Sequence, residues 1–237
     1  MNDAIKFCTI QKTKGCIVSD FIQNELIAFK QFKETYSFQF KEISEENGRL
    51  FCDGISITDE NGVLTPVCDK WINVGYNIKN PLSKALSNLF PYTFMFRGKE
   101  LSSIESFFQG IKFRDAYVQS YLFSYSGTDV VNIQSANNRR WQDEGLLYWQ
   151  GEAFERTSSR YIDLIDELYI SAIQNPLYRQ ALKNADRYIL HSIGKTNQNE
   201  TVFTRYEFEK ELNCLSAFLK CSDEAVQAKM LDKSILF

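Results

Sequence analysis

Three polar side chains of different charge, Glu105, Gln109 and Lys112, recur at helical spacing in the segment LSNLFPYTFMFRGKELSSIESFFQGIKF. At about 100° per residue they fall within about 60° of one another on a helix. The neighbouring face is apolar enough to be core and carries Ile104, Phe107, Phe108 and Ile111. A carboxylate, an amide and an ammonium beside a core face indicate the wall of a polar pocket.

Glu105 also has a purely structural interpretation. In Ser102-x-x-Glu105 the glutamate fits the third position of a capping box, where its carboxylate bonds back to the start of its own helix. Gln109 and Lys112 alone fit a solvated helix face. Capping does not account for their alignment with Glu105, so the pocket and the cap both stay open as interpretations.

Two arginines, Arg156 and Arg160, flank a pair of serines where a helix is expected to begin. They fit either ordinary surface charge or a phosphate clamp, because arginine offers a planar fork of donors to anionic oxygens. Aromatic side chains that could stack on a nucleobase precede these arginines in the chain, although burial is the commoner fate of tryptophan. They are Trp141, Tyr148, Trp149 and Phe154.

His191 is the only histidine, and it lies near an expected helix end. A hydrogen-bonded or dipole-stabilised imidazole is commoner in that position than a catalytic one. The chain contains no Walker-type glycine loop, no GxGxxG and no GxSxG, so three common enzyme classes lose support.

The composition is that of an ordinary globular protein. The chain has 237 residues, 44% apolar and 24% charged, which is enough to bury a sizeable core. A formal net charge of −3 gives no general attraction for nucleic acid or for anionic membranes, so any phosphate binding must be local.

Neither a secretory signal nor a membrane span is expected, because the start MNDAIKFCTIQKTKG lacks an apolar stretch and no long apolar run follows. The six cysteines form no CxxC pair, and one histidine is too few for a typical Cys/His zinc site. We therefore expect reduced thiols, a cytoplasmic location and no bound metal.

Residues 1–75 read as a small antiparallel sheet. Asn-Gly turn signals at Asn47-Gly48 and Asn61-Gly62 separate short β-branched and aromatic runs, which is typical of hairpins. FIQNELIAFKQF could form one helix within this segment. The expected strands are GCIVSDF, YSFQFKEI, RLFCDGISI and VLTPVCDKWINV.

From about Leu101 the apolar period becomes helical. After the helix that carries Glu105, one helix is expected before Asn175-Pro176, another between Pro176 and Gly194, and a third behind the capping box Thr204-x-x-Glu207. The polar segment 126–145 is expected to be a loop. The three apolar stripes are Tyr161, Leu164, Ile165, Leu168, Tyr169 and Ala172; Leu177, Ala181, Leu182, Ala185, Tyr188 and Ile189; and Phe208, Leu212, Leu215 and Leu219.

The order LSN, an aromatic-rich run, GK and then E-x-x-x-Q-x-x-K-F resembles the NADAR (YbiA-like) family, whose pattern is an early Ser-Asn followed by Ser-x-Glu-x-x-x-Gln-x-x-Lys-Phe. The stretches YWQGEAFERTSSRY, QNPLYRQALKNADRYILHSIGK and TVFTRYEFEKEL are similar to the C-terminal half of that family. The resemblance covers about residues 76–220 and carries over to Ser87, Asn88, Glu105, Gln109 and Lys112.

This resemblance implies an α+β fold in which a mostly helical, YbiA-like core (76–220) follows a β-rich segment (1–75) and precedes a C-terminal tail (221–237). It also implies an N-glycosidase that cleaves the bond between ribose C1 and nitrogen, in early riboflavin-pathway intermediates or in ADP-ribose attached to guanine. No metal and no cofactor are expected. The expected partner is a small nucleotide or ADP-ribosylated guanine, free or within nucleic acid, and no membrane.

The residue types suit that reaction. Glu105 would stabilise the oxocarbenium character of the ribose and orient or deprotonate water. Lys112 would bind phosphate, hold a carbonyl of the leaving group, or attack the opened ribose aldehyde as an amine. Gln109 and Asn88 suit ribose hydroxyls or base edges.

Three further residues, Ser87, Trp149 and Arg156, complete the expected substrate-binding set, with Trp149 as a stacking residue and Arg156 as a phosphate contact. The YbiA-type branch has a Trp-Gly-Asp-Gly block near its C-terminus that contributes an acidic residue to the site. Here the region reads HSIGKTNQNETVFTRYEF. The chain therefore resembles a different branch, and its second acidic or aromatic site residue is unassigned.

Three hypotheses of different classes follow. The first is an N-glycoside hydrolase acting on an ADP-ribosyl or ribosylamine-phosphate conjugate. The second is a non-catalytic module that binds NAD or ADP-ribose, and the third is a scaffold in which Glu105 only caps its helix. The alignment of Glu105, Gln109 and Lys112 favours catalysis, because a pure binder of an anionic ligand need not keep a carboxylate facing it.

Overall fold

Short strands and longer helices alternate along the chain, which confirms the expected α+β class with its mostly helical core. The computed structural model describes residues 16–58, 63–64, 69–134 and 140–234. The helices are α1 (Cys16–Thr35), α2 (Pro81–Ala85), α3 (Ile104–Gly110), α4 (Ala116–Phe123), α5 (Gly127–Gln134), α6 (Arg140–Glu144), α7 (Ser159–Ala172), α8 (Pro176–Asn184) and α9 (Arg205–Ser234). The strands are β1 (Ile43–Glu46), β2 (Arg49–Cys52), β3 (Ile55–Ser56), β4 (Trp71–Asn73), β5 (Phe94–Phe96), β6 (Lys99–Leu101), β7 (Leu146–Trp149), β8 (Glu152–Glu155) and β9 (Tyr188–Leu190).

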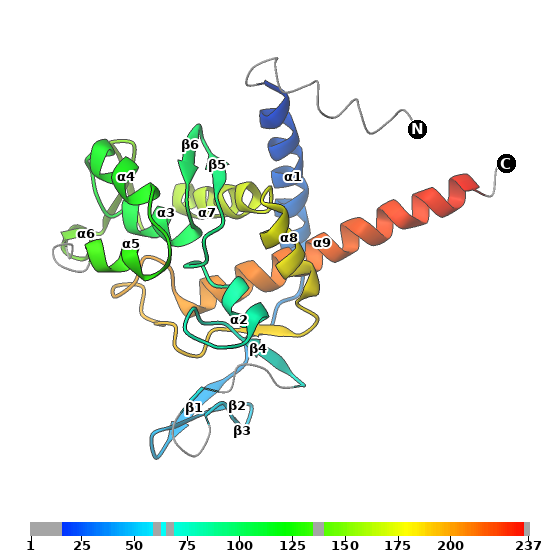
Figure 1. Cartoon of the computed structure of the whole chain (residues 1–237), viewed down its shortest axis with the longest axis horizontal. Helices are drawn as coiled ribbons and strands as arrows, with labels where there is room; N and C mark the ends of the chain where they lie inside the picture. The colour runs from blue at the N-terminus through cyan, green and yellow to red at the C-terminus, as the bar shows by residue number, and fades with distance from the viewer. Residues whose placement is uncertain (1–15, 59–62, 65–68, 135–139, 235–237) are drawn as a thin grey trace.

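The small antiparallel sheet expected near the N-terminus is present as β1-β2-β3, and it projects from one end of the helical body (Figure 1). Asn47 and Gly48 both have positive φ, 51° and 74°, as the type I′ turn of a β1–β2 hairpin requires. The second predicted turn, Asn61-Gly62, lies outside the described residues.

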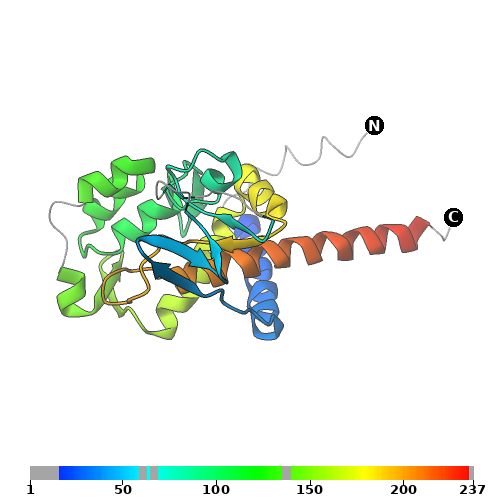
Figure 2. The ribbon, with the colours of Figure 1, turned by 90° about the horizontal axis from the view of Figure 1, so that it is seen from below.

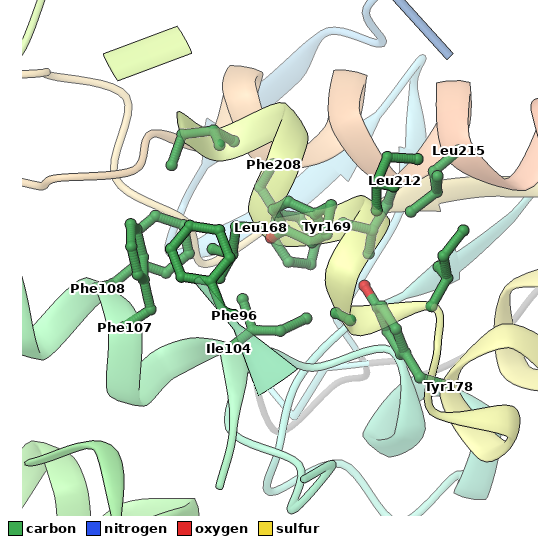
Figure 3. Packing of buried hydrophobic residues seen from close by; sticks show 14 of the residues in the cluster. Phe96, Ile104, Phe107, Phe108, Leu168, Tyr169, Tyr178, Phe208, Leu212 and Leu215 are labelled. Atoms are coloured by element: carbon green, nitrogen blue, oxygen red, sulfur yellow. The ribbon is translucent and has the colours of Figure 1, made fainter. Parts of the chain in front are cut away.

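The core forms where α3, α7, α8 and α9 meet, and α1 packs across α7 and α9. Figure 3 shows Phe107 of α3, Tyr169 of α7 and Leu212 of α9 converging in this region. The predicted apolar face of α3 and the stripes of α7 and α9 are fully buried, which confirms them. Leu177 of α8 is instead 69% exposed, and its neighbour Tyr178 fills the core.

The helix boundaries follow local capping chemistry. Asn175 caps α8 by accepting from the backbone amides of Leu177 and Tyr178, with Pro176 in the first turn as predicted. The capping box of α9 is confirmed. The Thr204 amide donates to Glu207 Oε2 at 2.7 Å, and the Glu207 amide donates to Thr204 Oγ1 at 3.2 Å.

Two predicted strands near the N-terminus are wrong. Residues 16–21 belong to α1, because the helical period of Ile22, Leu26 and Phe29 extends back through this short β-branched run. Residues 36–42 join no strand of the described chain, since the segment packs through its rings instead of a ladder. Phe38 stacks on Tyr188 with ring centroids 5.8 Å apart.

Two predictions in the C-terminal half are also wrong. The described residues of segment 126–145 form α5 and α6 instead of a loop, and Val130 and Trp141 anchor these helices in the core. The helix expected to reach Gly194 ends at Asn184, and Tyr188–Leu190 instead form β9. β9 pairs in parallel with β4, so a long-range partner overrides the local helical period.

Helix α1 shares the core of the helical half, because its Leu26 and Phe29 lie in the same buried cluster as residues of α7 and α9. Helix α9 runs across the expected boundary at residue 220, and Figures 1 and 2 both show its C-terminal half extending beyond the rest of the body. The division into 1–75, 76–220 and 221–237 stays a prediction.

Cys52, Cys214 and Cys221 are free thiols, while Cys8 and Cys68 lie outside the described residues. In the ranges that the structure describes, no group of three or more His, Cys, Asp or Glu side chains is placed to hold a metal ion. None of the described helices combines the length and the apolar character needed to cross a bilayer.

A buried ion-pair network joins α1, α7 and α9. Lys33 Nζ lies 2.6 Å from both Asp166 Oδ1 and Glu211 Oε2, and both carboxylate side chains are more than nine-tenths buried. Burial raises the pKa of Glu211 from 4.5 to about 7, although Lys33 opposes the shift. The folded state therefore keeps a proton that the unfolded state has lost, and this contribution to stability declines as the pH rises through about 7.

We predict that Lys33→Met lowers the free energy of unfolding by about 3–5 kcal/mol, because it leaves two buried carboxylates without their cation. The loss should be larger near pH 8 than near pH 5, where protonation of Glu211 relieves the repulsion. Urea unfolding at both pH values measures this. Lys30→Met is the matched control on the same helix, since its ion pair with Asp163 is exposed and should cost about 1 kcal/mol or less. Equal losses for the two variants would contradict the prediction.

Candidate active site

Helix α3 begins one residue later than the capping-box interpretation requires. Ser102 directly follows β6, and its amide donates to the Phe123 carbonyl at 2.8 Å. Ser103 is the N-cap, and its hydroxyl accepts from the Ser106 amide at 3.1 Å. Glu105 is therefore the second helical residue and does not close a capping box, so the cap interpretation is wrong. Its carboxylate is left for the pocket.

The three residues on the polar face of α3 form one hydrogen-bonded row. Lys112 Nζ donates to Gln109 Oε1 at 2.8 Å, and Gln109 Nε2 donates to Glu105 Oε1. Gln109 is 5% exposed and bridges the cation to the carboxylate through its two ends. None of the described residues donates to the other carboxylate oxygen, Glu105 Oε2. This row, called the α3 relay below, confirms that the three side chains share one face.

Burial brings the two ends of the α3 relay closer in pKa. It raises the pKa of Glu105 against the opposing charge of Lys112 and the Gln109 hydrogen bond. It also lowers the pKa of Lys112 from 10.5 to about 8, a shift that Glu105 opposes and Lys195 reinforces. A base and an amine that both titrate closer to neutrality than usual are suited to proton transfer or nucleophilic attack.

Ser87 and Asn88 border the relay from the turn that follows α2. The Asn88 carbonyl accepts from the Glu105 amide at 2.8 Å, so this turn is fixed to the first turn of α3. Asn88 Oδ1 accepts from the Tyr169 hydroxyl at 2.9 Å, and burial raises the pKa of Tyr169 well above 10, so the phenol keeps its proton. The Asn88 amide nitrogen has no acceptor among the described residues and remains a donor for a ligand.

These side chains line a cavity of about 230 Å³. Ser87, Asn88 and the α3 relay form one wall. The opposite wall comes from the end of β9 and the segment leading into α9, and its members are His191, Ile193, Gly194, Lys195, Thr201, Val202, Phe203 and Phe208. The cavity thus brings five of the predicted site residues together with a wall that the sequence left unassigned.

The chain is similar to proteins of a bacteriophage family. The family model described as Bacteriophage protein GP30.3 matches residues 81–217, a range that contains the α3 relay and both walls. A relative from Enterobacteria phage T4, an uncharacterized 17.1 kDa protein of the Gp30–rIII intergenic region, is 34% identical over 136 residues. The match covers 56% of this chain and 89% of that relative. This chain belongs to the GP30.3 family.

Among solved structures, the GP30.3-family chain is similar to YbiA of E. coli, with a TM-score of 0.38 and 17% sequence identity. The match covers 70% of this chain and 89% of YbiA.

Two of the predicted site residues lie away from the cavity of this GP30.3-family protein. Trp149 is 7% exposed and packs in the aromatic core, with its ring centroid 5.0 Å from that of Phe96 and 5.6 Å from that of Phe123. Arg156 is buried, forms an ion pair with Glu207 of the α9 capping box and does not line the cavity. An indole and a guanidinium are typical ligand contacts, but here Trp149 packs in the core and Arg156 binds the capping box.

Arg160, expected with Arg156 as a phosphate clamp, pairs with Glu152 instead. Both arginines are thus engaged by carboxylates, and the structure gives no support to a clamp. No sequence pattern marks Lys195, because a lone lysine in a polar loop has no characteristic spacing. It lines the cavity, with its side chain 62% exposed.

We predict that Glu105→Gln lowers the pKa of Lys112 further below 8, because the substitution removes the carboxylate that raises it. Lys195→Met should shift the same pKa upward, since it removes a neighbouring cation. Reductive ¹³C-methylation followed by NMR titration measures both, with Lys112→Arg identifying the signal. A Lys112 titration that is unchanged in Glu105→Gln would show that the relay is not electrostatically coupled.

Proposed function

We propose that this chain is a metal-independent N-glycoside hydrolase that cleaves the ribose C1–N bond of an ADP-ribosyl or ribosylamine-phosphate conjugate. The observation that supports this most strongly is the α3 relay, a buried carboxylate joined through an amide to a low-pKa lysine at the wall of a cavity. Burying charged and polar side chains costs free energy, and buried polar groups with shifted pKa values are typical of active sites.

The first step suits Glu105. As the C1–N bond breaks, its electron pair leaves with nitrogen and the ribose gains oxocarbenium character. The negative charge on Glu105 Oε2 stabilises this positive character. A water molecule then bonds to C1 and gives its proton to the same carboxylate. Burial raises the pKa of Glu105, which makes it a stronger base than an exposed glutamate.

Lys112 and Lys195 suit the anionic part of such a substrate. Two ammonium groups and one carboxylate are the charged groups that line the cavity, so an anionic sugar phosphate is favoured there. Lys112, with a pKa of about 8, can also donate a proton to the departing nitrogen or attack an opened ribose aldehyde. The donor amide of Asn88 suits a ribose hydroxyl.

We predict that Glu105→Gln abolishes base release while nucleotide binding survives, because the substitution keeps the shape and removes the charge. The substrates to incubate are ADP-ribosylated guanosine, ADP-ribosylated DNA and a pyrimidine ribosylamine phosphate, with mass spectrometry of the released bases. Calorimetry with ADP-ribose measures binding. Unchanged turnover by Glu105→Gln would reject the assignment, and tight binding without any product from the wild type would favour a non-catalytic binder.

Tyr169 is a positioning residue in this proposal, because it fixes the Asn88 amide through one hydrogen bond. Tyr169→Phe should raise the KM about 2- to 10-fold with little change in kcat, as expected from the loss of about 0.5–1.5 kcal/mol. Tyr178→Phe is the matched control. The Tyr178 hydroxyl is buried nearby without a partner among the described residues, so its removal should leave the KM unchanged and stabilise the fold. Equal KM values in all three proteins would contradict the role of Tyr169.

A further inference from the structure

A second cavity of about 570 Å³ adjoins the first. The two cavities have Ser87, Leu89, His191 and Ile193 in common, so these four residues form the boundary between them. Their combined size lies within the range of small-molecule sites, about 300–1,000 Å³. A ligand held beside the α3 relay therefore lies next to the second cavity.

The two cavities differ in chemistry. The first has the charged ends of the α3 relay and Lys195 in its walls. The walls of the second are mostly apolar, and its one charged lining residue is Lys79. Its apolar surface comes from Val63, Leu64, Tyr76, Ile78, Leu89 and Ile193. A charged sugar phosphate suits the first cavity, and an uncharged planar ring suits the second.

The second cavity is built mainly by a segment outside the GP30.3 family match. Seven of its eleven lining residues precede residue 81, where that match begins. Backbone pairing fixes this segment beside the site, because β4 pairs with β9 and the Val74 amide donates to the Leu190 carbonyl at 2.7 Å. Asn73 Nδ2 also donates to Ser192 Oγ at 2.9 Å. The region before residue 81 thus contributes a wall to the candidate site.

His191 lies where the two cavities join. Its Nδ1 is 3.1 Å from the Val74 carbonyl, which can only accept, so Nδ1 carries the proton and Nε2 keeps a lone pair. The ring packs on Phe208 with centroids 4.7 Å apart, and no described residue donates to Nε2. Burial lowers the pKa of His191, which favours this neutral form.

We propose that the second cavity binds the nitrogen heterocycle of the substrate, a ring of purine size, and that His191 Nε2 accepts an N–H hydrogen bond from it. The identification of this ring as the leaving group rests on the proposed function, whereas binding of the ring does not. The segment before residue 81 would then determine which base is accepted.

The test uses the full chain with two probes, hypoxanthine for the ring and ribose 5-phosphate for the sugar. Calorimetry should show that hypoxanthine binds equally well with and without saturating ribose 5-phosphate, because each occupies its own cavity. NMR of the only imidazole in the chain should show the Nδ1–H tautomer, and the Nε2 resonance should move when hypoxanthine is added. Mutually exclusive binding, or no binding of hypoxanthine, would overturn the proposal.

Variants of Tyr76 provide a second test. Tyr76→Leu should weaken hypoxanthine binding about tenfold through lost stacking and leave ribose 5-phosphate binding unchanged. Tyr76→Phe should retain the wild-type affinity, and Tyr117→Leu, at an 88% exposed tyrosine outside both cavities, is the matched control. Unchanged affinity in Tyr76→Leu would overturn the assignment.

The outcomes separate the two proposals. Hypoxanthine binding as predicted, without cleavage of any conjugate, would reject the hydrolase and keep the ring site. Cleavage of a conjugate together with mutually exclusive binding of the two probes would reject the ring site and keep the hydrolase.

Discussion

The burial of the α3 relay is the constraint on which the site depends. A carboxylate and an ammonium beside an aromatic core are costly to desolvate unless each finds a partner. Gln109 provides that partner for both ends, and the apolar face of the same helix provides the anchor. The ring of Phe107, for example, meets that of Phe96 edge to face at 5.4 Å. A helix held this firmly can keep its polar face in one geometry.

The second wall depends on long-range pairing. β9 lies in the C-terminal half of the chain and pairs with β4 from the N-terminal part, and this pairing carries His191 and Lys195 to the cavity. The ion pairs of Lys33 tie α1 to α7 and α9. The N-terminal region therefore supports the site as well as extending it, which explains why its helix belongs to the common core.

The sequence predicts correctly those features that depend on interactions between residues close together in the chain. The faces of α3, α7 and α9, the cap at Thr204 and the turn at Asn47 follow from spacing and side-chain chemistry, and so does the α3 relay. The wrong predictions concern residues whose structure depends on partners far away in the sequence. Tyr188 joins a strand because β4 is there to pair with it, Trp149 is buried because Phe96 and Phe123 surround it, and no local pattern contains either fact.

Reductive trapping tests most directly whether a ribose C1 sits beside the α3 relay. In brief incubation with ribose 5-phosphate, an unprotonated Lys112 amine would condense with the sugar aldehyde, lose water, and be fixed as a secondary amine by hydride from cyanoborohydride. The account predicts one adduct, mapped to Lys112 by peptide mass spectrometry and reduced in Asn88→Ala. Adducts spread over exposed lysines outside the cavity, such as Lys210, with none on Lys112, would contradict it.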